Sequence, residues 1–321
     1  MSRYRSILQS FLSAIRSDLR SLAPDIMAAP KSSLSATTSS SRTAAKISDY
    51  PNLSHPPAHS ALAQLKTVCD VKPLTIKVVD GKDGAVPAFL HLPQNYQQER
   101  STTRERTAAI LLSGAGGGVV GPSGIYLSIA DKLASLNQGI PVMRLDYRSP
   151  ARNEYCVSDV KAAMDYLRRE YSVSRFVLTG WSFGGAPVFT VAGNDARVIG
   201  CATVASQTAQ TDGIRRLSPR PLLLLHGTGD RTLGASCSER LFEMYGSRGD
   251  RELRLFDGDD HALTRNSLEA EEVLCNFIMK CAGVEIGDVE STIVKENLVG
   301  DANRVELMKA GGDLKGEESI E

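Results

Sequence analysis

The sequence predicts an α/β protein with a doubly wound, mostly parallel sheet and an antiparallel hairpin at its N-terminal edge. Three observations lead to this fold class. Apolar runs of strand type alternate with helix-type segments between residues 108 and 281. Two strand-type runs, at 74–79 and 86–92, are joined by the turn sequence DGKDG. The 321 residues, of which 42% are hydrophobic, suffice for one α/β domain with appendages.

The expected elements follow one another in a simple order. The hairpin comes first, because a short glycine-bearing turn joins its two strands. Strands and helices alternate after a charged loop at 94–107, and this alternation predicts crossover connections and parallel strands. The expected strands are 108–113, 140–145, 175–180, 198–206, 221–226 and 251–256, and the expected helices are 124–136, 156–171, 184–193, 235–246 and 265–281.

Composition divides the chain into four expected parts. The central part carries the alternating pattern, whereas the two ends are polar and the linker is rich in proline. The acidic C-terminal part is expected to be largely disordered, with one short helix near 302–310. The parts are a targeting or flexible segment at 1–48, a linker at 49–73, the α/β domain at 74–282 and the acidic tail at 283–321.

The N-terminal segment has an amphipathic, arginine- and serine-rich pattern. Its first 46 residues hold seven basic residues, two acidic residues and twelve serines. Two interpretations stay open: a mitochondrial or plastid transit peptide, or an ordinary amphipathic helix with a Ser/Thr-rich tail. A long apolar run typical of a secretory signal is missing, so we expect a cytoplasmic or organellar protein that is not secreted. The apolar stripe comprises Tyr4, Leu8, Phe11, Ile15, Leu19 and Leu22.

Net charge, apolar runs and cysteine spacing argue against nucleic-acid binding, a membrane span and a disulfide or zinc site. The 37 basic residues balance 37 acidic ones at a pI near 7.0, so no overall positive field favours nucleic acid. The sequence contains no apolar run of the roughly 18 residues that a transmembrane helix needs. The six cysteines are scattered without C-x-x-C spacing, which favours buried thiols in a reducing compartment over a disulfide frame or a zinc site.

The segment RFVLTGWSFGGAP at 175–187 contains the pattern G-x-S-x-G as Gly180-Trp181-Ser182-Phe183-Gly184. An apolar strand precedes the pattern and a helix-type segment follows it, which is the context of a sharp strand-to-helix turn that exposes a serine hydroxyl. Glycine is required on both sides of the serine, because a Cβ there would collide with the neighbouring strand and helix. Ser182 is therefore the candidate nucleophile.

A serine hydroxyl needs a base to take its proton and a third group to orient that base. Asp230 follows the apolar run PLLLLHG, and His261 follows the run ELRLF and a turn. Both lie at the carboxyl ends of predicted strands, the edge where open α/β sheets build their sites. The acids next to the histidine in sequence are less suited to hold its Nδ1 while Nε2 faces the serine. Those alternatives to Asp230 are Asp257, Asp259 and Asp260.

The remaining histidines have simpler interpretations. We expect His226 to pack within its turn and His91 to lie on a strand face. His55 and His59 lie in a proline-rich segment, where solvation is expected. Asp146 and Arg148 follow the run IPVMRL and are expected to form an ion pair or to brace a loop.

With the order Ser182, Asp230, His261, residues 74–281 resemble the α/β-hydrolase superfamily, and within it the small, nearly capless serine hydrolases similar to dienelactone hydrolases and serine esterases. The resemblance implies an oxyanion loop in AAILLSGAGGG at 108–118, where Ser113 replaces a histidine common in the family. The implied oxyanion donors are the backbone N–H groups of Phe183 and of Ala115 or Gly116. Dienelactone hydrolases carry cysteine as nucleophile, so Ser182 argues against that specific activity.

The resemblance and the residues together predict a serine hydrolase that acts on a small acyl substrate, namely an ester, a lactone or a thioester. Peptidase or acyltransferase activity stays open because the same triad serves all of them, as does a catalytically silent binding protein. The resemblance implies no metal and no organic cofactor. The connection at 207–219 is too short for a helical cap over the site, so the pocket is expected to be shallow and to prefer short acyl groups, unless residues 62–68 or the N-terminal stripe fold over it.

Overall fold

The computed structural model describes residues 44–57, 69–94, 96 and 105–315, and every structural statement below refers to these residues. The amphipathic stripe and His59 lie outside the described residues. Of the helices in the described ranges, none combines the length and the apolar character that crossing a bilayer requires.

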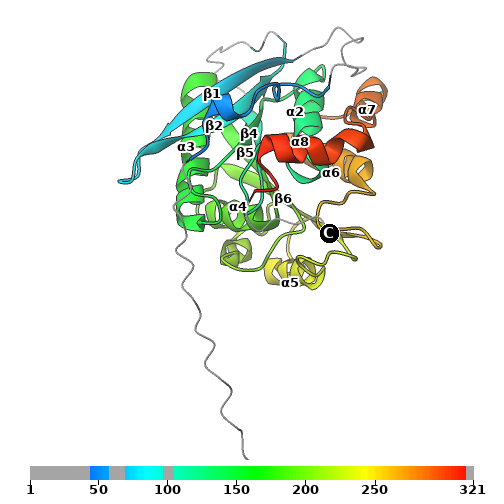
Figure 1. Ribbon diagram of the computed structural model, residues 1–321. Coiled ribbons are helices and arrows are strands. Elements are labelled where there is room, and N and C mark those ends of the chain that lie inside the picture. Colours follow the sequence, from blue (N-terminus) through cyan, green and yellow to red (C-terminus); the bar gives the residue numbers. More distant parts are fainter. Residues whose placement is uncertain (1–43, 58–68, 95, 97–104, 316–321) are drawn as a thin grey trace, which may run out of the picture. The chain divides into compact units, whose positions relative to one another are not determined.

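The core of the domain is one sheet with the strand order β1-β2-β4-β3-β5-β6-β7-β8 (Figure 1). The predicted hairpin is confirmed, since β1 and β2 pair antiparallel, and β2 is also antiparallel to β4. All further pairs are parallel, which confirms the predicted fold class. The strands are β1 Asp70–Val78, β2 Gly84–Leu92, β3 Arg106–Leu112, β4 Val142–Leu145, β5 Val173–Trp181, β6 Val198–Val204, β7 Leu222–Gly227 and β8 Arg251–Phe256.

Helices cover both faces of this sheet, as a doubly wound fold requires. They are α2 Ile125–Ser135, α3 Asn153–Tyr171, α4 Gly185–Ala192, α5 Ser236–Tyr245, α6 Ser267–Ala282, α7 Asp288–Val294 and α8 Arg304–Gly311. The alternation of side chains along β3 decides which face each residue serves. Ala109 and Leu111 belong to the core with α2 and α6, whereas Ala108, Ile110 and Leu112 belong to the core with α3, α4 and α5. Each fully buried Leu or Ile contributes roughly 1.5–3 kcal/mol, so both cores hold the sheet in place.

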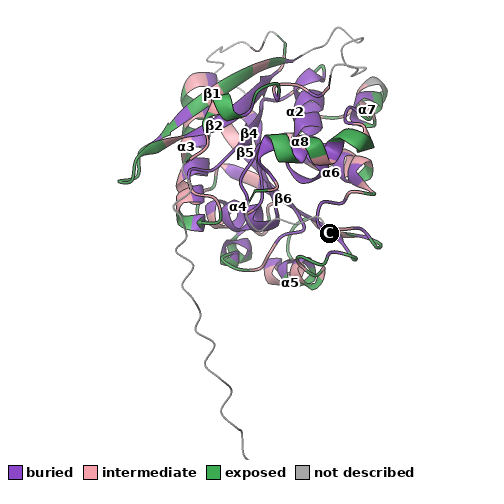
Figure 2. Ribbon diagram, viewed as in Figure 1, coloured by how far each residue is buried: buried purple, intermediate pink, exposed green. Residues whose placement is uncertain are grey.

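The folded domain extends beyond the predicted limits at both ends. Tyr50 and Leu53 are buried in the core within the expected linker, and β1 begins at Asp70 rather than at residue 74. In the tail 283–321, the short helix expected near 302–310 is confirmed as α8, which buries one of its sides (Figure 2), whereas α7 and the buried residues around it were expected to be disordered. The reason is a set of apolar side chains within the charged sequence, namely Ile293, Val294, Leu298, Val299 and Met308, all buried.

Candidate active site

Ser182 lies at the sharp turn between β5 and α4. Its φ of 53° falls in the left-handed region, which a residue with a side chain adopts at a cost of about 1–3 kcal/mol. The two glycines of the motif make the turn possible: a Cβ on Gly180 would lie 2.4 Å from the carbonyl oxygen of Gly184, and a Cβ on Gly184 would lie 2.6 Å from that of Ser113. The sharp strand-to-helix turn predicted from the sequence is therefore present, with a strained backbone at Ser182, and it lies against the end of β3.

His261 and Asp230 meet at the same edge of the sheet, each in a loop after its strand. Nδ1 of His261 lies 2.6 Å from Oδ2 of Asp230, and both side chains are buried. The other oxygen of Asp230 accepts backbone N–H groups of Thr232 and Leu233, both at 2.8 Å. Burial on its own raises the pKa of the Asp230 carboxyl, but hydrogen bonds from His226 and His261 outweigh it and hold this pKa well below its usual value. Asp230 is thus a fixed, ionised partner for His261.

Trp181 connects the serine turn to the histidine loop. Its indole Nε1 donates to the backbone carbonyl of His261 at 2.9 Å, and the two rings lie 5.5 Å apart. Because Trp181 directly precedes Ser182, this bond holds the loop of His261 beside the turn of Ser182. The three residues predicted to act together therefore lie at one edge of the sheet.

The acids near His261 in sequence shape its loop. Asp259 accepts hydrogen bonds from the backbone N–H groups of Arg265 and Asn266 at 3.1 and 3.0 Å, and Asp260 accepts from those of Ala262 and Thr264. Asp257 accepts from the hydroxyl of Thr228 at 3.2 Å. Through these hydrogen bonds the three acids stabilise the turn after β8.

His226 is a site residue that the sequence did not identify, because we expected it only to pack within its turn. Its Nε2 lies 3.1 Å from Oδ2 of Asp230 and 2.8 Å from the carbonyl oxygen of Leu233. Both neighbours are acceptors, so Nε2 carries the proton and Nδ1 accepts from the Ser238 hydroxyl at 2.7 Å. His226 therefore gives Asp230 a second histidine donor. The only signal for it in the sequence is the spacing of four residues from Asp230.

The glycine-rich loop after β3, residues 113–121, is the candidate oxyanion loop. Two residues at the end of β4 hold it by hydrogen bonds. Gly118 N–H donates to Oδ1 of Asp146 at 2.8 Å, and the carbonyl of Val119 accepts from Arg144 at 3.0 Å. Asp146 thus braces a loop, as one of its two predicted roles. Across the site, Phe183 is buried with its ring edge-on to Tyr147 at 6.1 Å.

A second cluster of polar side chains lies between α2, β2 and the segment before β1, with His91, Cys69 and Asp131 buried and His55 partly exposed. Asp131 lies 3.1 Å from Nδ1 of His55, 2.7 Å from Nδ1 of His91 and 3.4 Å from Sγ of Cys69. His55 stays partly exposed, as its position in the proline-rich segment led us to expect, and gains a partner in Asp131 that the sequence did not predict. His55, Cys69 and Asp131 are residue types that hold metals, but Arg144 donates to Nε2 of His91 at 3.0 Å, and its buried positive charge disfavours a cation there. We interpret the cluster as a structural network.

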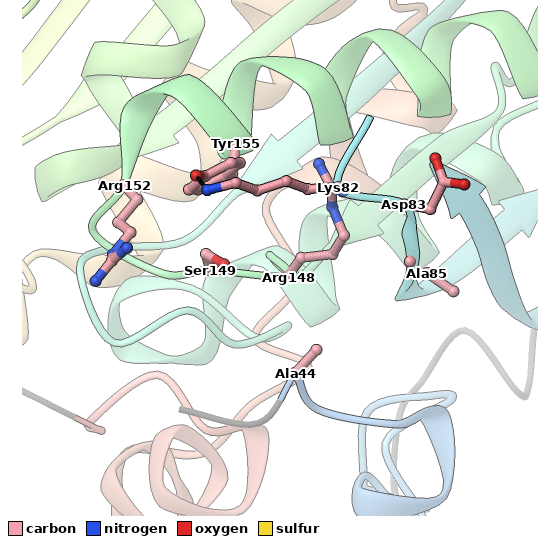
Figure 3. A pocket seen from close by; sticks show the side chains of 9 residues that line it. Ala44, Lys82, Asp83, Ala85, Arg148, Ser149, Arg152 and Tyr155 are labelled. Carbon is pink, nitrogen blue, oxygen red and sulfur yellow. Dashed lines mark hydrogen bonds between the residues drawn. The ribbon is translucent and has the colours of Figure 1, made fainter. Parts of the chain in front are cut away.

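A pocket of about 270 Å³ lies beside the β1–β2 turn, and the described residues that line it do not include Ser182, Asp230 or His261. Figure 3 shows the long side chain of Lys82 reaching Tyr155, to whose hydroxyl it donates. Arg148 forms ion pairs with Asp80 at 2.6 Å and Asp159 at 2.5 Å. These two cations of the pocket are thus engaged by the protein itself.

Comparisons with known proteins agree with this architecture. A family model described as alpha/beta hydrolase fold matches residues 111–242, which include Ser182 and Asp230. A search of curated protein sequences finds no match.

Several solved structures are similar to this one over about two thirds of the chain. Est1E from Butyrivibrio proteoclasticus is 14% identical, with 65% of this chain and 99% of that chain covered at a TM-score of 0.52. The esterase domain of a Rhodothermus marinus protein is 21% identical, with 66% and 98% covered and a TM-score of 0.51. Dienelactone hydrolase from Anabaena variabilis is 15% identical, with 65% and 98% covered and a TM-score of 0.51. At these identities the likeness establishes a shared fold.

Proposed function

The chain belongs to the α/β-hydrolase superfamily, and from this premise we propose that it is a serine hydrolase that cleaves an ester, a lactone or a thioester through an acyl-enzyme. The observation that carries the proposal is the 2.6 Å contact between His261 and Asp230 beside the strained turn of Ser182. An ionised aspartate on Nδ1 leaves Nε2 as the nitrogen that exchanges a proton with a nucleophile.

The proposed reaction has two halves. Ser182 Oγ attacks the acyl carbon while His261 takes its proton, and the carbonyl oxygen becomes an oxyanion. The backbone N–H groups of Phe183 and of Ala115 or Gly116 would stabilise that oxyanion. His261 then protonates the leaving alcohol or thiol as its bond to the acyl carbon breaks. Water attacks the acyl-enzyme in the second half, with His261 again as base, and releases the acid and Ser182.

The class of substrate rests on more general support. The similar structure from Rhodothermus marinus is an esterase domain, which supports a carboxylic ester as the first substrate class to test. Ser182 at the nucleophile position, rather than cysteine, separates this chain from the activity of dienelactone hydrolases proper.

Labelling with a fluorophosphonate probe tests the proposal, because the probe phosphonylates an activated serine. We expect the wild type to label at Ser182, as located by peptide mass spectrometry, and to hydrolyse p-nitrophenyl acetate. Ser182→Ala should lose labelling, and its kcat should fall on the order of 10⁵- to 10⁶-fold with an unchanged circular dichroism spectrum.

Ser206→Ala is a matched control for this test. Ser206 is also buried, and its hydroxyl oxygen lies where a Cβ on Gly185 would collide with it, so it neighbours the same turn. This control should label like the wild type. Labelling that persists in Ser182→Ala, or a wild type that does not label, would refute the proposed function.

A further inference from the structure

The C-terminal segment 304–315 packs against the candidate oxyanion loop. Helix α8, red in Figure 1, contacts the short helix η3 Pro122–Gly124, which lies between this loop and α2. Gly311 accepts the backbone N–H of Val119 at 3.1 Å. Arg304 anchors the start of the helix, because its buried guanidinium donates to the carbonyl of Ser123 at 3.0 Å. The segment thus meets the loop along its length.

Asp313 makes three hydrogen bonds between the C-terminal segment and the loop 113–121. Its Oδ1 accepts from the Ser113 hydroxyl at 2.5 Å and from the N–H of Gly121 at 2.7 Å, and its Oδ2 accepts from the N–H of Val120 at 3.1 Å. The side chain is fully buried, and its own N–H bonds to the carbonyl of Met308 at 2.9 Å. One carboxyl group therefore joins the first residue of the loop to its last two.

The glycines of the loop leave room for this segment. A Cβ on Gly118 would lie 2.5 Å from the Asp313 carboxyl carbon, and a Cβ on Gly116 would lie 2.0 Å from the carbonyl oxygen of Lys315. Any larger residue at these two positions would push the segment away. The glycine content of the loop thus serves the close approach of the C-terminal segment, in addition to any catalytic role.

Ser113 links this contact to the serine turn. The carbonyl oxygen of Ser113 is the atom that a Cβ on Gly184 would meet, and it accepts from the Tyr147 hydroxyl at 3.1 Å. Asp313 holds the side chain of the same residue. The distance between the loop and the turn after Ser182 is therefore set at a residue that Asp313 touches directly.

We propose that Asp313 is a positioning residue for catalysis, which fixes the loop 113–121 so that its oxyanion donors face Ser182. The inference rests on the proposed function and adds a segment outside the predicted hydrolase domain to its active site. Asp146 and Arg144 brace the loop from the sheet, and Asp313 closes it from the opposite end of the chain. Asp313 belongs neither to the sheet nor to either of its apolar cores. We therefore expect its removal to misalign the oxyanion donors with Ser182.

The test compares Asp313→Ala and Asp313→Asn with Glu306→Gln, which removes an exposed charge from helix α8 of the same C-terminal segment. Two quantities are measured: kcat and KM for p-nitrophenyl acetate, and the inhibition constant of a trifluoromethyl ketone. Ser182 adds to this ketone and forms a tetrahedral oxyanion. A displaced oxyanion donor costs about 10- to 100-fold. We expect Asp313→Ala to lower kcat and to raise the ketone constant by that factor, with KM within about twofold. Asp313→Asn should lose less, and Glu306→Gln should equal the wild type.

The outcomes separate this inference from the proposed function. A wild type without fluorophosphonate labelling at Ser182 would refute both. A labelled wild type, together with a folded Asp313→Ala of normal kcat and normal ketone affinity, would overturn only the role of Asp313. Should Asp313→Ala fail to fold, Ser113→Ala decides, because it removes one donor to Asp313 and leaves the loop backbone intact. A lower kcat and weaker ketone binding in Ser113→Ala would support the inference, and unchanged values would overturn it.

Discussion

Nδ1 of His261 lies 2.6 Å from Oδ2 of Asp230, although the two residues are 31 positions apart and belong to loops after different strands. The parallel pairing of β7 and β8 brings these loops to one edge of the sheet. Backbone donors from Thr232 and Leu233 fix the other oxygen of the carboxylate, so only one face of Asp230 is directed at the imidazole. This arrangement sets the tautomer of His261, with its proton on Nδ1.

Asp230→Asn should therefore depress turnover severely. An amide NH₂ facing Nδ1 would favour the tautomer with its proton on Nε2, so His261 could no longer act as the base. We expect kcat to fall about 10³- to 10⁴-fold. Asp259→Asn is the control, because Asp259 braces Arg265 and Asn266, and its kcat should stay within a few-fold of the wild type. Steady-state kinetics with p-nitrophenyl acetate decide the matter. A crippled Asp259→Asn beside an active Asp230→Asn would move the triad acid to Asp259.

His226→Phe should weaken the same acid without removing it. The change deletes a buried donor to Asp230 and leaves the part-buried carbonyl of Leu233 without this bond. Losing such a bond costs about 1–3 kcal/mol of stability. We expect kcat to fall roughly tenfold or less, since His261 remains as the second donor.

Ser238→Ala serves as the comparison for His226→Phe, because Ser238 bonds only the far nitrogen of that ring. Its effect on kcat should be smaller. Chemical denaturation and kinetics on both variants test the idea. Equal kcat values for His226→Phe and the wild type would show that the contact with Asp230 has no influence on catalysis.

Local patterns were sufficient to predict the fold and the three residues of the candidate triad. Apolar runs in the sequence predict β5, β7 and β8 and the residues at which they end. Because these strands are parallel, the polar residues that follow them meet at one edge of the sheet. The same reasoning identified the glycines around Ser182, because a Cβ on either of them would collide with the backbone of the turn or of the neighbouring strand.

The contacts of the C-terminal segment could not be predicted in this way. Ser113 and Asp313 are 200 positions apart, and no strand order or periodicity relates them. The glycines and acids of the segment suggested disorder, although one of those acids is fully buried in the loop. The cluster of Cys69, His91 and Asp131 was missed for the same reason: its members come from separate elements and meet only in the folded chain.

Stability should fall as the pH rises through the range in which Asp313 titrates. Burial raises the pKa of its carboxyl to about 8, assisted by the negative charge of Asp146 and opposed by hydrogen bonds from Ser113, Gly121 and Val120. Tyr126 and the cation of Arg144 also face it. The unfolded chain releases this proton near pH 4, whereas the folded chain keeps it to about pH 8. The folded state thus binds more protons between these values and loses stability as the pH rises through them.

Asp313→Asn cannot titrate at this position, so comparison with it isolates the effect. Between pH 5 and pH 8.5 the Tm of the wild type should fall further than the Tm of Asp313→Asn. Melting curves across the range, with Glu306→Gln as a control for an exposed acid, provide the measurement. Parallel Tm curves for wild type and Asp313→Asn would mean that Asp313 is ionised in the folded protein at all these pH values.

The last prediction concerns acyl length and follows from the connection between β6 and β7. All residues of this connection are among those that the structure describes, and its one helix is the short η5 Asp212–Arg216. A single turn cannot close over a long acyl chain as packed cap helices do, so extra methylenes should gain far less than the ~0.8 kcal/mol of full burial. We expect a preference for acyl groups of about two to four carbons, because longer chains extend into water. Values of kcat/KM for p-nitrophenyl esters from acetate to octanoate, which share one leaving group, test this. A steady rise towards octanoate would mean that another segment roofs the pocket. The C-terminal segment at Lys315 is the first place to look, because it already lies against Gly116.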